Sequence, residues 1–359
     1  MPDAIPHAAL ARAVRAAFGA SAHVVSTRPL AGDASSRRYV RLDLAGGAAP
    51  ATAVAMLLRG SRFPLGSDEI GGGPAADGEL PFVNVARYLA ARGLPVPAIY
   101  HDASAADDLV LIEDVGETTL WAAATAVPER APALFEAAVD LLVALQVAGA
   151  RHPDPSCHAF RQRFERHLAR WELGHFVEHG IETRHGRELP PDERAALLAA
   201  LDPVSEPFAA AEPVLAHRDF MAWNIHVQDG RLRLIDFQDA LLAPDAYDLG
   251  ALLTDRTTAM LVDPALEAVL LERFRRGRAA AGLPVAGDLE ARYRACVLQR
   301  ALKVIGRFYF LEVVQGKPGY LAYLPGVYAV ARRMLAALPD GGVLRAQLAA
   351  HVPELGAGT

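Results

Sequence analysis

The sequence predicts an α+β fold with two lobes, a small β-rich N-lobe of residues 1–115 and a larger helical C-lobe of residues 116–359. Three observations predict it. Short apolar runs of strand length fill the first third of the chain, and helical periodicity dominates the remainder. In addition, 359 residues are more than one hydrophobic core usually organises.

The first third alternates between β-type runs and two helices. One helix is expected over residues 5–19, and a second begins near Pro81 and ends at Gly93, with apolar residues at i, i+3, i+4 and i+7. The Gly- and Pro-containing stretch 60–78 is expected to be a loop. Strands are expected over residues 23–29, 37–44, 51–58, 96–101 and 109–113.

The remainder of the chain is mostly helical in its periodicity. One non-helical island, residues 214–247, interrupts the helices, and a short acidic segment at residues 111–116 joins the two lobes. This order of a β-rich lobe, a joint and a helical lobe is typical of a protein-kinase-like fold. Helices are expected over residues 121–148, 160–178, 192–201, 264–281 and 289–310.

Composition excludes several other classes. The formal net charge of −6 argues against a nucleic-acid-binding protein, which usually has a basic face. The two cysteines, Cys157 and Cys296, are far apart and have no metal-ligand spacing, which favours a reducing, cytoplasmic environment. Residues 1–22 lack the apolar run of a signal peptide, and we expect no membrane span.

Three polar residues of the island have the spacing that phosphoryl transfer needs. Asn224 follows Asp219 by five residues, and Asp236 follows Asn224 by twelve. A carboxylate at Asp219 can accept or orient the proton of an attacking hydroxyl. An amide oxygen at Asn224 and a carboxylate at Asp236 are the hard ligands that Mg²⁺ prefers. Each residue alone reads as an ordinary turn residue, but the three together predict a catalytic site.

Candidate phosphate-binding residues lie in the first turn and on the following strands. Backbone N–H groups and the hydroxyls of Ser35 and Ser36 are predicted to cover the phosphates of ATP. Kinases normally place a lysine on the third strand, where this chain has Met56. Another cation is then needed to bind the phosphates. Arg38 is the first candidate for it and Arg59 is the second.

The glutamate that usually pairs with that lysine is also replaced, because the following helix offers Phe82 and Val83. Losing both partners is more consistent than losing one, since a lone buried charge is costly. A nucleotide-binding pseudokinase is the alternative interpretation.

The segment that joins the two lobes is predicted to bind adenine. It offers the backbone carbonyl of Glu113 and the backbone N–H of Val115 as hydrogen-bonding groups.

Candidate acceptor-binding residues are Asp239, Arg300 and Lys303. Arg300 and Lys303 recur with Arg307 on one face of a late helix, which is either a solvated face or a cationic patch beside the acceptor. Asp248 is expected to brace the catalytic loop.

These motifs resemble the aminoglycoside phosphotransferase and choline kinase superfamily, and more narrowly the bacterial N-acetylmuramate/N-acetylglucosamine kinases of cell-wall recycling. The narrower resemblance rests on the first turn, Met56, residues 235–240 and residues 298–304. It implies that ATP and Mg²⁺ are used to phosphorylate the anomeric hydroxyl of an amino sugar. The sugar 1-phosphate would pass to a uridylyltransferase in peptidoglycan recycling. A kinase for an aminoglycoside, choline or homoserine is the alternative enzyme.

Overall fold

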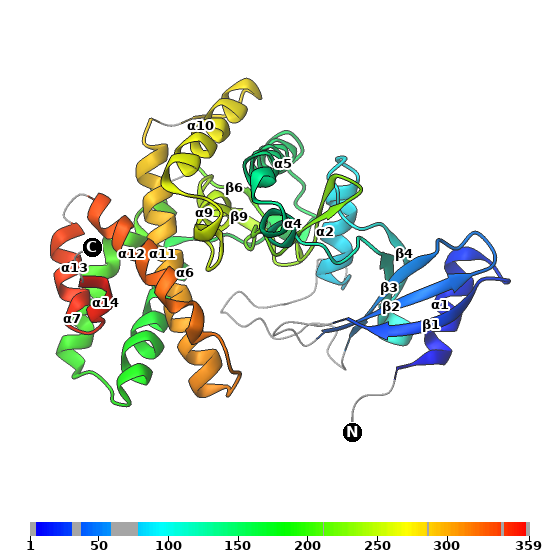
Figure 1. Ribbon diagram of the computed structural model, residues 1–359, viewed down its shortest axis with the longest axis horizontal. Helices are drawn as coiled ribbons and strands as arrows, with labels where there is room; N and C mark the ends of the chain where they lie inside the picture. Colours follow the sequence, from blue (N-terminus) through cyan, green and yellow to red (C-terminus); the bar gives the residue numbers. More distant parts are fainter. Residues whose placement is uncertain are drawn as a thin grey trace. The chain divides into compact units, whose positions relative to one another are not determined.

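The computed structural model describes residues 5–30, 37–58, 78–210, 212–285, 287–338 and 341–356. The chain divides into two compact units. We call the first the sheet unit; it consists of Met1–Thr118, Asp154–Ala159 and His226–Asp239. The second, the helical unit, consists of Thr119–Pro153, Phe160–Ile225 and Ala240–Thr359. The predicted α+β class is confirmed, because a β-sheet organises the first unit and helices organise the second (Figure 1).

The sheet unit is built on a five-stranded sheet in the order β1-β2-β3-β5-β4, in which all neighbours are antiparallel. Helix α1 covers one face of the sheet, where its Leu10 and Val14 pack with Val40 and Leu42 of β2. The elements are α1 (His7–Phe18), β1 (His23–Pro29), β2 (Arg37–Ala45), β3 (Thr52–Leu58), α2 (Pro81–Ala90), β4 (Ile99–Ala103), α3 (Ser104–Asp107), β5 (Leu109–Glu113) and the hairpin of β7 (Ile225–Gln228) and β8 (Arg231–Leu234).

The strand register decides which side chains share a face. Tyr39 lies opposite Met56, so both belong to the face that α1 does not cover. Arg38 lies opposite Leu57, which belongs to the core under α1. The alternating apolar residues of β2 therefore face the core of this unit.

The helical unit contains one long central helix, α11 (Leu289–Tyr309), against which η3, α9 and α12 pack (Figure 1). Its other elements are α4 (Leu120–Ala126), η1 (Pro128–Arg130), α5 (Ala131–Arg151), α6 (Arg166–His175), the π-helix η3 (Phe176–Thr183), α7 (Pro191–Ser205), α8 (Pro207–Ala210), β6 (Val214–Ala216), β9 (Leu241–Ala243), α9 (Tyr247–Thr254), η4 (Thr258–Met260), α10 (Pro264–Ala280), the π-helix η5 (Phe310–Val314), η6 (Leu321–Tyr323), α12 (Leu324–Ala337), α13 (Gly341–Ala349) and α14 (Pro353–Gly356). A further 3-10 turn, η2 (His158–Phe160), has its first two residues in the sheet unit and its last in the helical unit.

Three predicted boundaries are wrong, and proline explains two of them. The helix expected over 121–148 is interrupted, because Pro128 has no N–H donor and starts a new turn. The strand expected over 96–101 begins only at Ile99, because Pro95 and Pro97 have no N–H to donate. The helix expected from residue 160 begins at Arg166.

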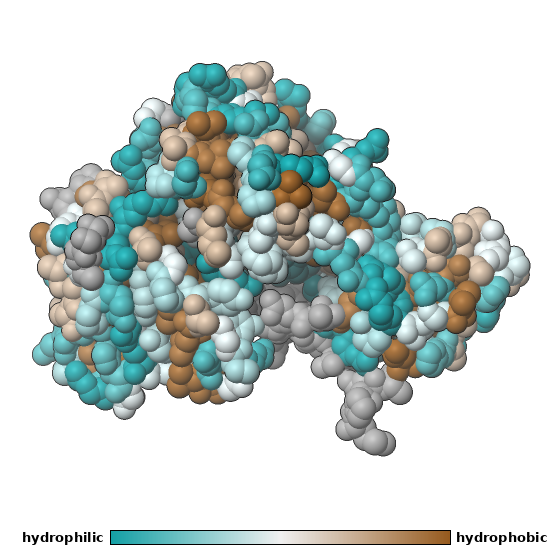
Figure 2. All heavy atoms as spheres, in the orientation of Figure 1, coloured by the Kyte–Doolittle hydropathy of each residue, from teal (hydrophilic) through white to brown (hydrophobic). Residues whose placement is uncertain are grey.

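Among the described residues, one helical segment, Pro128–Arg151, is long and apolar enough by length and composition to cross a membrane. In this structure, 61% of its most apolar window is buried inside the protein. On the visible face of the helical unit, hydrophobic and hydrophilic residues are interspersed (Figure 2). The segment therefore packs as a core helix of the helical unit.

Candidate active site

The predicted catalytic loop of the helical unit is fixed at its start by a buried carboxylate. Strand β6 leads into the loop, and the backbone N–H groups of His217 and Arg218 donate to the two oxygens of Asp248, at 2.5 and 3.0 Å. Arg218 has a φ of 79°, which is uncommon for a side chain of this size. Asp248 thus braces the loop, as predicted, and its hydrogen bonds hold a conformation that would otherwise be unfavourable.

Asp219 and Asn224 lie close together in this loop. The carbonyl oxygen of Asp219 accepts from the backbone N–H of Met221 at 2.8 Å and from Nδ2 of Asn224 at 2.9 Å. The Asp219 side chain is 39% exposed. Its carboxylate is therefore accessible to a small substrate, while its backbone is held by the loop.

Arg300 of α11 forms an ion pair with Asp219, with Nη2 at 3.4 Å from Oδ1, and the same nitrogen lies 3.1 Å from Sδ of Met221. Burial raises the pKa of Asp219, but the charges of Arg300, Lys303 and Arg218 outweigh burial and lower the pKa to about 2. Asp219 is therefore a carboxylate at neutral pH.

The second predicted cation, Lys303, pairs with the buried Glu172 of α6. Glu172 also accepts from Nε2 of Gln299 at 2.7 Å. Both cations on this face of α11 therefore have carboxylate partners in the helical unit. Arg300 contacts the predicted catalytic residue, and Lys303 links α11 to α6.

An aromatic and cationic cluster adjoins the loop, and the sequence analysis did not predict it. Trp223, next to Asn224, stacks on Trp121 with ring centroids 4.3 Å apart. The guanidinium carbon of Arg256 lies 5.7 Å from the Trp223 ring centroid and 5.0 Å from that of Tyr323. We call Trp121, Trp223, Arg256 and Tyr323 the aromatic cluster. Its members are distant in sequence, so no local pattern reveals it.

Asp255 connects this cluster electrostatically to the loop. Burial raises the pKa of Asp255, and the charges of Arg300 and Arg256 oppose the rise. Among the described residues, Oδ2 of Asp255 and Nε of Arg256 have no hydrogen-bond partner. Buried polar atoms of this kind are suited to bind a polar ligand.

In the sheet unit, Asp236 and Asp239 are held side by side. Nε2 of Gln238 donates to Oδ1 of Asp236 at 2.9 Å and to Oδ2 of Asp239 at 3.0 Å. Between them, the fully buried Phe237 stacks on Phe82 of α2 at 5.0 Å. The aromatic pair anchors the segment after β8 and leaves the two carboxylates exposed.

The first candidate for the phosphate-binding cation, Arg38, lies on the core face of the sheet, opposite Leu57. Its neighbour Arg37 lies on the same face as Met56, the position where the lysine is expected. Burial raises the pKa of Tyr39, the Arg37 charge opposes the rise, and the charges of Asp236 and Asp239 add to it. Arg37 and the carboxylates of Asp236 and Asp239 therefore all lie near Tyr39, and sequence alternation alone did not single out Arg37.

The predicted hinge residues lie in a network of polar contacts. The Glu113 carboxylate accepts from the backbone N–H of Ala98 at 2.9 Å and pairs with Arg233. The carbonyl of Asp114 accepts from Gln228, and the carbonyl of Gly116 contacts Nδ1 of His226. These contacts use the Glu113 side chain and the carbonyls of Asp114 and Gly116, and none of them uses the groups predicted to bind adenine, the carbonyl of Glu113 and the N–H of Val115. The other predicted ATP-binding residues, Ser35 and Ser36, and also Arg59, lie outside the described residues.

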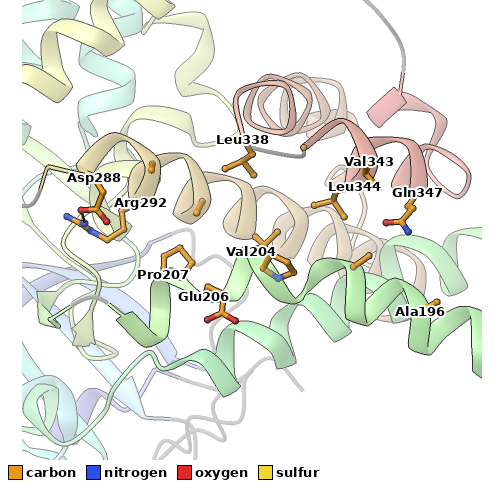
Figure 3. A pocket seen from close by; sticks show the side chains of 15 residues that line it. Ala196, Val204, Glu206, Pro207, Asp288, Arg292, Leu338, Val343, Leu344 and Gln347 are labelled. Carbon is orange, nitrogen blue, oxygen red and sulfur yellow. Dashed lines mark hydrogen bonds and ion pairs between the residues drawn. The ribbon is translucent and has the colours of Figure 1, made fainter.

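A pocket of about 740 Å³ opens between α7, α11 and the C-terminal helices (Figure 3). Its lining is mostly apolar, with the Asp288–Arg292 ion pair at one end. None of the predicted site residues in the described ranges lines it. The catalytic candidates therefore lie elsewhere.

Comparison with known proteins identifies relatives over most of the chain. The N-acetylmuramate/N-acetylglucosamine kinase of Pseudomonas aeruginosa is 32% identical over 281 residues, which are 73% of this chain and 78% of the relative. The protein of the same name from Neisseria meningitidis serogroup B is 33% identical over 263 residues, 70% of this chain and 75% of the relative.

Solved structures share the fold at low sequence identity. The choline kinase of Cryptosporidium parvum Iowa II has a TM-score of 0.56 at 10% identity, covering 89% of this chain and 91% of that chain. The ADP-bound aminoglycoside phosphotransferase APH(2″)-Ib has a TM-score of 0.53 at 15% identity, covering 86% and 92%. The sequence pattern of the phosphotransferase enzyme family matches residues 26–296. This chain therefore belongs to the phosphotransferase enzyme family, which confirms the resemblance seen in its motifs.

Proposed function

We propose that this protein is an ATP-dependent kinase that phosphorylates the anomeric hydroxyl of N-acetylmuramate, N-acetylglucosamine or both. The names of the curated relatives support this substrate class. The product would be a sugar 1-phosphate, which a uridylyltransferase would consume in peptidoglycan recycling. The protein would act in the cytoplasm, and its two buried, free cysteines are compatible with a reducing compartment.

The observation that carries the proposal is the state of Asp219. Its carboxylate is ionised by Arg300 and partly exposed, and its backbone is held by Asn224. A carboxylate with a pKa of about 2 is a weak base, so Asp219 would orient the sugar hydroxyl more than it would remove its proton early. An anomeric hydroxyl is more acidic than an ordinary alcohol, which suits a weak base.

The residues present fit a magnesium–nucleotide complex. Asn224 and Asp236 offer an amide oxygen and an exposed carboxylate, both hard donors, and would hold Mg²⁺. Mg²⁺ supplies charge neutralisation at the phosphates when it is bound. Arg37 would contribute a positive charge from the Met56 face, in the role first assigned to Arg38. The backbone of Glu113 and Val115 would bind adenine, and Ser35 and Ser36 would cover the phosphates.

For the acceptor, the aromatic cluster offers what an acetylated acidic sugar needs. Apolar ring faces can pack against a sugar ring, and Arg256 is held between two of them. The lactyl carboxylate of N-acetylmuramate needs a cation. Because Arg300 and Lys303 already pair with Asp219 and Glu172, we assign that carboxylate to Arg256. Asp239 stays a candidate for hydrogen bonding to sugar hydroxyls.

The experiment is a turnover assay with ATP and Mg²⁺ in which N-acetylmuramate, N-acetylglucosamine, kanamycin and choline are compared as acceptors. We expect turnover with the acetylated sugars only, and a product that is stable to alkali but labile to acid, as a sugar 1-phosphate is. Turnover confined to kanamycin or choline would replace the sugar-kinase assignment. ATP binding without turnover of any acceptor would favour a pseudokinase.

A further inference from the structure

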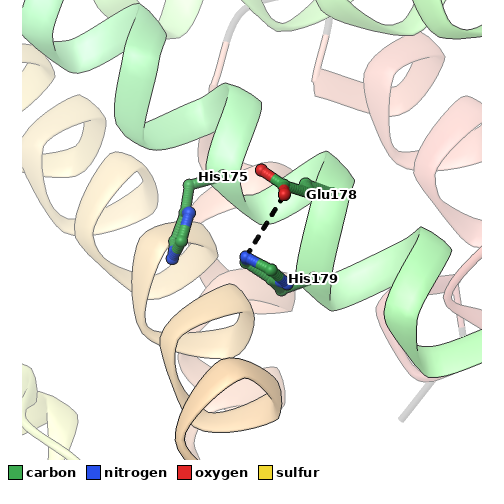
Figure 4. A group of neighbouring side chains, drawn as sticks. All are labelled: His175, Glu178 and His179. Atoms are coloured by element: carbon green, nitrogen blue, oxygen red, sulfur yellow. Dashed lines mark ion pairs between the residues drawn. The ribbon is translucent and has the colours of Figure 1, made fainter. Parts of the chain in front are cut away.

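Two histidines and a glutamate converge at the junction of α6 and η3 in the helical unit. His175 is the last residue of α6, and Glu178 and His179 lie in the π-helical turn that follows. One potential ligand atom from each of the three lies within 4.8 Å of the others. Figure 4 shows the three side chains projecting from one helical segment, with the Glu178 carboxylate turned toward the His179 ring. We call them the His–Glu–His cluster.

Their spacing is a chelating one. His175 and His179 are at i and i+4, and Glu178 is at i+3, so all three share one face of a helical segment. Two imidazoles at i and i+4 on one helix face can ligate the same metal ion. Here the two rings meet edge to face with centroids 4.3 Å apart. His179 lies in a π-helical turn, and such turns are frequent at functional sites.

His179 is oriented as a metal-binding histidine is. Its Nδ1 lies 3.0 Å from Oγ1 of Thr183, and its Nε2 lies 3.6 Å from Oε1 of Glu178. In metal sites, the nitrogen that does not bind the metal usually makes such a hydrogen bond, which fixes the ring and its tautomer. Nε2 therefore faces the point where the three ligand atoms meet.

The charges around the cluster are compatible with a cation. The carboxylates of Glu178 and Glu182 and the guanidinium of Arg307 are close enough to His179 to interact with it electrostatically. Two carboxylates near the cluster outnumber one guanidinium, which favours a cation. The Trp171 ring stacks on His175, and the exposed Glu178 gives an ion access from solvent.

We propose that the His–Glu–His cluster binds one divalent transition-metal ion, for which zinc is the best match. Two imidazole nitrogens and one carboxylate oxygen are a ligand set typical of Zn²⁺, which would leave one position for water. Mg²⁺, which prefers oxygen ligands, is a poor match for two nitrogens. The site is therefore different in chemistry from the magnesium site proposed for the kinase reaction, and it does not depend on that proposal.

The cluster lies in a segment that packs tightly on α11. A Cβ added at Gly306 of α11 would come within 2.7 Å of Cα of Phe176, so the two helices meet at close range. Phe310, which follows α11, contacts both imidazole rings. A bound ion would fix the π-helical turn that packs on α11, and would raise the thermal stability of the protein by mass action.

The test uses the full-length protein without nucleotide, since ATP also chelates metals. Co²⁺ would be added as a spectroscopic probe, and Zn²⁺ binding would be measured by titration calorimetry. We expect one ion per chain, the visible absorption of four-coordinate Co²⁺, and an increase of Tm with Zn²⁺. His175→Gln and Glu178→Gln should each weaken zinc binding by about 100-fold or more, and Thr183→Val by about 10-fold to 100-fold through loss of the supporting hydrogen bond.

His167→Gln is the matched control. His167 is an exposed histidine 3.7 Å from Glu165, but it is not a member of the cluster, so its replacement should leave zinc affinity unchanged. Glu178 is exposed, so Glu178→Gln keeps the test valid if a histidine variant fails to fold. Absence of four-coordinate Co²⁺ absorption in the wild type, or an affinity that Glu178→Gln and His175→Gln leave unchanged, would overturn the proposal.

Discussion

Arg300 on α11 and Asp219 in the catalytic loop form an ion pair in which the guanidinium is nearly buried and the carboxylate is partly open, with side-chain exposures of 8% and 39%. The buried cation fixes one side of the carboxylate and keeps it ionised, while the other side stays accessible. Arg300 is thereby a positioning residue for Asp219.

Arg300→Met should lower kcat by about 100-fold, because loss of the ion pair lets the Asp219 carboxylate move from its reactive position. KM for ATP should change little. Steady-state kinetics would measure both. Arg294→Met, which removes an arginine paired with Glu290 near the exposed start of the same helix, is the control and should keep kcat. Equal kcat values for the two variants would rule out the positioning role.

Arg37→Met and Arg38→Met are a matched pair on adjacent positions of β2. Arg37 shares the face of Met56, and Arg38 lies on the opposite face. Replacing Arg37 should raise KM for ATP by about 10-fold to 100-fold, since a hydrogen bond to a charged group is worth about 1.5–3 kcal/mol. Replacing Arg38 should have a smaller effect on KM. A larger increase in KM for ATP in Arg38→Met than in Arg37→Met would restore Arg38 as the phosphate-binding cation.

Arg256→Met should lower kcat/KM for N-acetylmuramate about 10-fold more than for N-acetylglucosamine, because only the former carries a carboxylate to pair with the guanidinium. The ratio of the two kcat/KM values is the measurement. Lys303→Met is the comparison, since Lys303 pairs with Glu172. A change of the ratio in Lys303→Met alone would assign the lactyl carboxylate to Lys303.

Asp248→Asn should destabilise the protein by about 1–3 kcal/mol at neutral pH, because one of two buried N–H groups loses its acceptor. Burial raises the pKa of Asp248 to about 6, above its unfolded value, although the nearby His217 charge and two backbone hydrogen bonds oppose the rise. The folded state then binds the carboxyl proton of Asp248 more tightly than the unfolded state does. The contribution of Asp248 to stability therefore decreases as pH rises from about 4 to about 6.

Denaturant unfolding of wild type and Asp248→Asn at a series of pH values would test this linkage. The difference in unfolding free energy between the two proteins should fall across that pH range and level off above pH ~7, because the asparagine does not titrate. A difference that is independent of pH would show that folding does not raise the pKa of Asp248.

Much of the fold follows from patterns within short stretches of the chain. The alternating residues of β2 and the apolar run of β3 predicted the sheet, and the spacing of Asp219, Asn224 and Asp236 predicted phosphoryl transfer. The C-terminal helices α12 and α13 were not predicted. The apolar residues of α12, such as Leu324, Val327 and Tyr328, do recur at helical spacing, whereas the Ala- and Gly-containing sequence of α13 has weak apolar periodicity.

What the sequence could not predict depends on contacts between distant residues. Trp121 stacks on Trp223 across about a hundred positions of the chain. Arg37 and Arg38 can be told apart only when the register of β2 against β3 is known. The spacing of His175, Glu178 and His179 is visible in the sequence, but Thr183 orients the second ring only once the π-helical turn forms.

The most direct measurement of the central claim is turnover of ATP with N-acetylmuramate or N-acetylglucosamine by Asp219→Asn. The control is Asp229→Asn, a replacement in the exposed turn between β7 and β8, where φ is 50° and asparagine is well tolerated. We predict that Asp219→Asn lowers kcat by about 100-fold to 10,000-fold while the protein stays folded, and that the control keeps its activity. Undiminished turnover by Asp219→Asn would contradict the assignment of Asp219 as the catalytic residue.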